Sequence, residues 1–105
     1  MEYTLRGVLA ERGQKVRIDE DGKKHVVGSL GNPKELLEAV DVARWNQYHV
    51  IAEGGHVVLK INGRTMCELH DNDPRRIKRG WLGLQVHVGP PMRVQFKDIY
   101  LREFD

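Results

Sequence analysis

The sequence has 105 residues and a mass of 12.1 kDa, which is enough for one small domain with a thin core. Hydrophobic residues make up 40% and charged residues 30% of the chain, and the net charge of +2 is too small to predict a nucleic-acid partner. The single cysteine, Cys67, excludes a disulfide within the chain. No apolar run approaches the roughly 20 residues that cross a bilayer, and residues 1–6 do not resemble a signal peptide, so no membrane partner is predicted.

The first 30 residues predict three strands. Residues 3–10 are rich in side chains that favour β-structure, residues 16–18 alternate apolar with charged side chains, and residues 25–30 form a return strand. Asp21 and Gly22 lie between the second and third of these segments and are a strong signal for a hairpin turn.

One short helix is predicted after these strands. Asn32 is a good N-cap residue, and Pro33 after it suits the first helical position. Leu36, Leu37 and Val40 are spaced as one apolar face of about two helical turns. We expect the helix to end near residue 41.

The remainder of the chain predicts β-structure. Gly54–Gly55 and Asn62–Gly63 are two-residue turns, and the second is the strongest hairpin signal in the sequence. Strands are predicted at residues 48–53, 56–61, 65–70, 81–88 and 92–102. About eight short antiparallel strands with one short helix indicate an all-β sandwich or barrel, and they argue against a parallel α/β fold.

Four short phrases in this region carry a family resemblance. They are W-N-Q-Y at 45–48, the strand pair that ends in N-G at 62–63, G-W-L-G-L-Q-V-H at 80–87 and F-K-D-I at 96–99. In this order the chain resembles the 3-keto-disaccharide hydrolase family, and residues 5–16 are also similar to it. The resemblance implies an antiparallel jelly-roll β-sandwich of the concanavalin and glucanase kind.

The resemblance also implies that the chain is a shortened form of the family domain. Family domains have roughly 200 residues, within the normal range for one sandwich. Phrases of their N-terminal half that line much of the sugar cleft are not found in this sequence. We therefore expect residues 1–105 to form a single domain that corresponds to the C-terminal half.

Gln85 and His87 are the first candidate site residues. They lie two positions apart on a predicted strand, so their side chains project from the same face. The resemblance implies that His87 is a catalytic acid or base at the floor of a sugar cleft and that Gln85 binds substrate oxygens. The alternative is that both lie on the polar outer face of a half-buried strand, whose opposite, apolar face is formed by Leu82, Leu84, Val86 and Val88.

Three further residues are candidates for substrate binding. Trp81 stands at a junction between loop and strand, where its ring could stack on a sugar or pack in the core. The resemblance implies that Arg6 and Asp71 assist the reaction. Trp45 precedes an alternating strand, and we expect it to pack in the core.

No metal ion or other cofactor is predicted. Residues 71–73 offer carboxylate oxygens, but they lack the pattern of a calcium loop and read as a solvated turn. His49, His56 and His70 fall on different predicted strands, which leaves zinc binding open but weakly supported. Cys67 has no neighbouring base and is expected to be inert.

Two functions follow from these observations. The preferred one is a carbohydrate-related β-sandwich module that self-associates and binds sugar without full catalysis, because half a sandwich leaves apolar faces and sheet edges open. The alternative is an active enzyme, a hydrolase or lyase that cleaves 3-keto-glycosides, with its site completed by a homo-oligomer. The predicted partners are a second copy of the chain, most simply as a dimer, and a carbohydrate ligand. Relatives are mostly exported, but the sequence leaves the compartment open.

Overall fold

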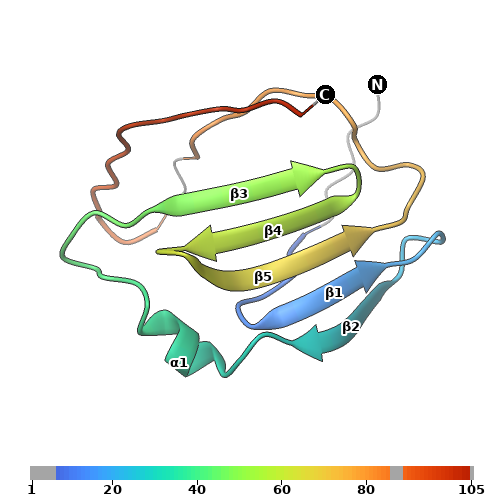
Figure 1. Cartoon of the computed structure of the whole chain (residues 1–105), viewed down its shortest axis with the longest axis horizontal. Helices are drawn as coiled ribbons and strands as arrows, with labels where there is room; N and C mark the ends of the chain where they lie inside the picture. The colour runs from blue at the N-terminus through green and yellow to red at the C-terminus, as the bar shows by residue number, and fades with distance from the viewer. Residues whose placement is uncertain (1–6, 86–88, 105) are drawn as a thin grey trace.

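The fold is an open five-stranded sheet with one short helix (Figure 1). The computed structural model describes residues 7–85 and 89–104. The elements are β1 (Gln14–Ile18), β2 (Lys24–Ser29), α1 (Pro33–Leu37), β3 (Tyr48–Glu53), β4 (His56–Ile61) and β5 (Arg64–Asp71). An all-β fold with one short helix is therefore confirmed, as expected of a sandwich fragment.

The strands lie in the order β2-β1-β5-β4-β3, so β5 is central and β2 and β3 are the edges. The pairs β1–β2, β3–β4 and β4–β5 are antiparallel hairpins, whereas β1 and β5 run parallel, with Ile18 beside Asp71. The sheet is thus mixed, although only antiparallel pairs were expected. The parallel pair arises because the hairpin β1–β2 docks on β5 from the distant end of the sequence, which the local turn signals do not specify.

The predicted hairpin turn after β4 is confirmed. Asn62 and Gly63 have φ angles of 52° and 80°, as the two central positions of a type I′ turn require. The Asn62 side chain also fixes its surroundings: its Nδ2 donates to the carbonyl oxygen of Ala39 at 2.6 Å, and its Oδ1 accepts from the backbone N–H of Gln47 at 2.8 Å. Asn62 Nδ2 lies 2.9 Å from Oδ1 of Asn46, so residues from two of the family phrases meet here.

The helix begins as predicted and ends earlier. The Asn32 side chain accepts a hydrogen bond from the backbone N–H of Lys34, as an N-cap does. Beyond α1 the backbone N–H groups of Ala39 and Val40 bond to carbonyls three residues back, so the last turn tightens and the helix stops at Leu37. Leu36 is fully buried.

The core is small. Among the described residues, the buried apolar side chains are Val16, Ile18, Leu36 and Met66. They come from β1, β5 and α1, so the core lies at the centre of the sheet and does not extend along its whole face. This agrees with the thin core expected from the length.

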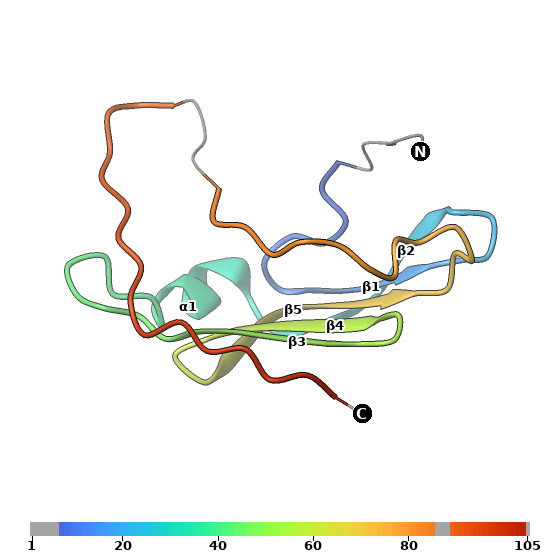
Figure 2. The same ribbon diagram turned by 90° about the horizontal axis from the view of Figure 1, so that it is seen from above.

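The described residues after β5 do not form strands. Residues 81–85 and 89–104 are extended chain without sheet pairing, so in these parts the predicted strands 81–88 and 92–102 are wrong. Residues 7–10, predicted as part of a first strand, are also unpaired. Figures 1 and 2 show the red C-terminal segment passing outside the β3 edge without joining the sheet. Within the described residues no helix is long and apolar enough to cross a membrane.

We expect Asn62→Gly to lower the free energy of unfolding by about 1–3 kcal/mol, because glycine keeps the turn but removes the side-chain hydrogen bonds. Asn62→Ala should cost about 1 kcal/mol more, since alanine disfavours a positive φ. Urea unfolding of both variants measures this. Equal stability of Asn62→Gly and the wild type would show that the side-chain bonds contribute nothing.

Candidate functional site at one end of the sheet

Polar side chains converge where β1 and β5 end and β4 begins. Because β1 and β5 are parallel, their last residues, Ile18 and Asp71, lie side by side. The start of β4 joins them through the cross-strand pair His56 and His70 and through a 2.7 Å hydrogen bond from the Asp71 N–H to the carbonyl oxygen of Gly55. This end of the sheet is the candidate functional site.

A histidine–glutamate–histidine cluster lies on one face of this site. The Nε2 atom of His56 is 2.7 Å from Oε1 of Glu68, and Nε2 of His70 is 3.3 Å from the same oxygen. The two imidazole rings stack, with centroids 4.1 Å apart and planes within 10°. The hydrogen bond from His56 is the main cause that lowers the pKa of Glu68, with the charge of Lys15 contributing less, so the carboxylate is held ionised. Among the described residues, these three side chains are the group that could hold a metal ion.

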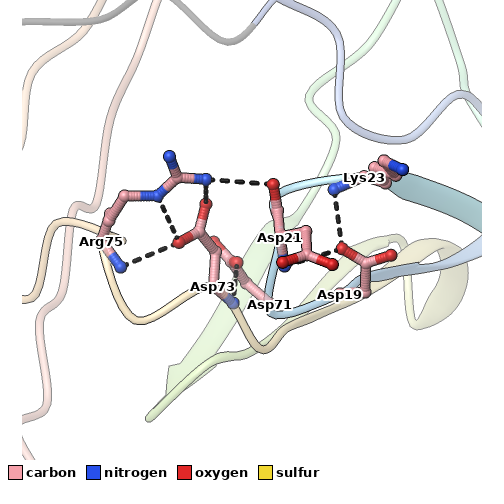
Figure 3. A network of polar contacts seen from close by, with 6 residues as sticks. All are labelled: Asp19, Asp21, Lys23, Asp71, Asp73 and Arg75. Carbon is pink, nitrogen blue, oxygen red and sulfur yellow. Dashed lines mark hydrogen bonds and ion pairs between the residues drawn. The ribbon is translucent and has the colours of Figure 1, made fainter.

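Arg75 and several aspartates form a polar network in the loop after β5, beside this cluster (Figure 3). The Arg75 guanidinium donates to both oxygens of Asp73, at 2.9 and 3.0 Å, and to the carbonyl oxygen of Asp21 at 3.1 Å. The hydrogen bonds to Asp73, together with the charge of that carboxylate, raise the pKa of Arg75. Through its bonds to Asp73 and Asp21, Arg75 connects the loop after β5 to the turn between β1 and β2, which is a structural role.

Asp19 organises that turn. Its Oδ1 accepts from the backbone N–H groups of Asp21 and Lys23, each at 2.9 Å, and its Oδ2 lies 2.7 Å from Nε2 of His25. The hydrogen bond with His25 is the largest cause that lowers the pKa of Asp19 to about 2.

An open depression of about 250 Å³ lies at this end of the sheet. It is lined by Arg17, Asp19, Glu20, Asp21 and Asn72. Its lining is almost wholly polar and offers both hydrogen-bond donors and acceptors, which suits a hydroxyl-rich ligand.

Asp71, a predicted substrate-binding residue, is the last residue of β5 and is 7% exposed. Its Oδ1 accepts from the backbone N–H of Asp73 at 3.1 Å. The structure therefore places this carboxylate at the candidate site but beneath its surface, and its role in substrate binding stays a prediction.

The other predicted site residues are not gathered around Asp71 in the part of the chain that the structure describes. Trp81 and Gln85 are exposed on the extended segment after β5. No described hydrogen bond or ring contact links either of them to Asp71. Arg6 and His87 lie outside the described residues, so their predicted roles are unchanged.

Trp45 is more accessible than expected. The prediction that it packs in the core is wrong, since it is 53% exposed. Lys97 Nζ lies 4.3 Å from the centroid of its ring, so the first and last family phrases are in contact. Trp45 lines a second open depression of about 330 Å³, together with Val42, Ala43, Arg44, Arg93 and Gln95.

The sequence pattern indicated His56 and His70 as possible metal ligands but did not indicate Glu68. The available signal was the spacing of Glu68 and His70, which are two apart on a strand and share a face. What the sequence did not reveal is that His56 would lie opposite His70.

The comparison with known families supports the resemblance. Residues 5–102 match the sequence model of the 3-keto-alpha-glucoside-1,2-lyase-like domain. This covers nearly the whole chain and confirms the family recognised from the four phrases. No curated protein and no solved structure is significantly similar to the chain.

We expect Asp19→Ala to destabilise the protein in a pH-dependent way. Because the pKa of Asp19 falls from 3.8 to about 2 on folding, its ionised carboxylate stabilises the fold above pH 4, and this contribution is lost as the pH falls through 2. The urea midpoints of wild type and variant should therefore differ at pH 4–6 and converge near pH 2. A difference that stays constant down to pH 2 would contradict this role.

Proposed function

Because the chain belongs to the 3-keto-alpha-glucoside-1,2-lyase-like family, we propose that it is a self-associating β-sandwich module that binds carbohydrate, and that one copy alone does not form a complete catalytic site. The observation that carries this proposal is the unusually large exposed surface of the chain. Family membership indicates a carbohydrate ligand, and the large exposed surface indicates that a second copy of the chain covers part of it.

The chain exposes far more surface than a compact monomer of its size. Its accessible surface is 9519 Å², whereas a folded monomer of this mass exposes about 6,000 Å². The radius of gyration is 15.1 Å, against about 13 Å for a compact domain of this length. The excess of about 3,500 Å² is enough to supply the subunit face of an obligate dimer interface.

Much of the exposed apolar surface is on the extended segment after β5. Its exposed members are Trp81, Leu82, Leu84, Met92, Val94, Phe96, Ile99, Tyr100, Leu101 and Phe104. Soluble monomers rarely leave such a series uncovered, and a second copy would cover it in a twofold arrangement. This supports a homodimer as the working form.

The surface around Trp45 supports carbohydrate binding. An aromatic face with Arg44, Arg93 and Gln95 around it combines a stacking platform with hydrogen-bond donors and an amide, which is the mixture that a sugar ring requires. Trp81 offers a second, fully exposed aromatic face.

The alternative is an active enzyme whose site is completed by the second copy. In a 3-keto-glycoside the ketone acidifies the neighbouring C2–H bond. A base removes this proton, the electron pair forms a C1=C2 double bond, and the C1–O bond breaks as the leaving oxygen takes up a proton. His87 is the residue proposed to hold the transferred proton, with Gln85 on a substrate oxygen. This alternative is favoured by the exposure of Trp81 and Gln85, which would need a second surface to form a cleft.

We expect the purified chain to have a mass in light scattering of about twice 12.1 kDa, as a homodimer requires. Ile99→Glu, in the extended segment, should shift the mass toward the monomer, because it places a charge in the buried interface. Ile77→Glu is a matched control, since Ile77 is similarly exposed but lies in the loop before this segment. A monomeric wild type at micromolar concentration, or equal effects of both variants, would contradict the proposal.

We expect a 3-keto-α-glucoside to bind in isothermal titration, and Trp45→Ala to weaken binding at least tenfold through the loss of the stacking face. The Val50→Ala variant should bind like the wild type, because Val50 is a half-exposed strand residue that does not line the depression around Trp45. If product also accumulates and is lost in His87→Ala, the chain is the active enzyme. A dimer with neither binding nor turnover would overturn the carbohydrate role while leaving self-association intact.

A further inference from the structure

We propose that His56, Glu68 and His70 bind one divalent first-row transition-metal ion, with Zn²⁺ as the best fit. The donor set is two imidazoles and one carboxylate, which is a set that zinc uses with three protein ligands and one open position. The proposal rests on this cluster alone and does not depend on the proposed sugar chemistry.

The spacing of the three donor atoms suits a metal. In a tetrahedral site with ligands about 2.0–2.1 Å from zinc, neighbouring donor atoms lie about 3.3 Å apart. His70 Nε2 and Glu68 Oε1 are already 3.3 Å apart, and His56 Nε2 is 2.7 Å from the same oxygen. All three donor atoms lie within 4.8 Å of one another. A metal would therefore replace the His56–Glu68 hydrogen bond after these two atoms move about 0.6 Å apart and the stacked imidazole rings turn toward a common point.

The strands hold the donors in place. Glu68 and His70 are two apart on the central strand β5, so they share a face, and His56 is the direct cross-strand neighbour of His70 on β4. The ligand positions are thus set by backbone pairing on both strands, which lowers the ordering cost of binding. Cys67, between Met66 and Glu68, projects from the opposite face by strand alternation and is not a ligand.

Two cationic side chains lie next to the cluster on the neighbouring strand β1. Lys15 is the cross-strand neighbour of Glu68, and Arg17 is that of His70. These two cations oppose a divalent ion and limit its affinity.

Access is open from solvent. The His56 and His70 side chains are each 43% exposed, while Glu68 is 17% exposed. The ion can therefore enter without unfolding, and its remaining position is free for water or an oxygen donor of a ligand. This is the arrangement of an exchangeable site, unlike a closed structural one.

The test uses the full chain stripped with a chelator and titrated with Zn²⁺ in competition with a chromophoric chelator. We expect one Zn²⁺ per chain, with affinity reduced at least tenfold in His56→Ala, His70→Ala and Glu68→Gln. His49→Ala is the matched control, because His49 is an exposed strand histidine outside the cluster. Circular dichroism of each variant checks that the sheet is retained.

Co²⁺ provides a second readout that does not depend on any variant. Bound Co²⁺ should show visible bands of a low-coordinate site without the near-ultraviolet charge transfer that a thiolate ligand produces. Sub-stoichiometric binding, equal losses in His49→Ala and the cluster variants, or a thiolate band would overturn the proposal.

Discussion

The fold depends on the central strand β5 and on one irregularity within it. β5 pairs with β4 on one side and with β1 on the other, so it joins the hairpin β1–β2 to the hairpin β3–β4. Between Thr65 and Cys67 its register with β4 shifts by one residue, which leaves Met66 as an extra residue in β5. Met66 is buried, and its carbonyl accepts a hydrogen bond from the backbone N–H of Gly13 at 2.7 Å. The bulge is thereby fixed to the segment that leads into β1.

This bulge decides which side chains meet at the candidate site. A regular hairpin from the Asn62–Gly63 turn would place His56 opposite Leu69, with Glu68 and His70 on the other face. The one-residue shift places His56 opposite His70 instead, and a single-residue change of register moves side chains from one face to the other. The histidine–glutamate–histidine cluster is therefore a consequence of how Met66 is accommodated.

The thin core and the large exposed surface have a common cause. Only the centre of the sheet is packed, by residues of β1, β5 and α1, while the segment after β5 contributes contacts such as that of Lys97 with Trp45 and leaves most of its apolar side chains exposed. Family membership and this exposed segment together motivate a carbohydrate-binding module that needs a second copy. That the chain is half of the family domain stays a prediction.

The sequence by itself determined the features that depend on neighbouring residues. The Asn62–Gly63 turn, the Asn32 cap and the hairpin strands β3, β4 and β5 follow from local backbone preferences and alternation, and the family follows from the order of its phrases. Only the tertiary structure decided the parallel pairing of β1 with β5, the exposure of Trp45 and the meeting of His56 with Glu68 and His70. The strand signals at residues 81–85 and 92–102 failed because alternation shows that a segment could form a strand but does not decide whether it pairs with an edge strand such as β3. Pairing and register are set by contacts between distant segments, and the local sequence does not contain them.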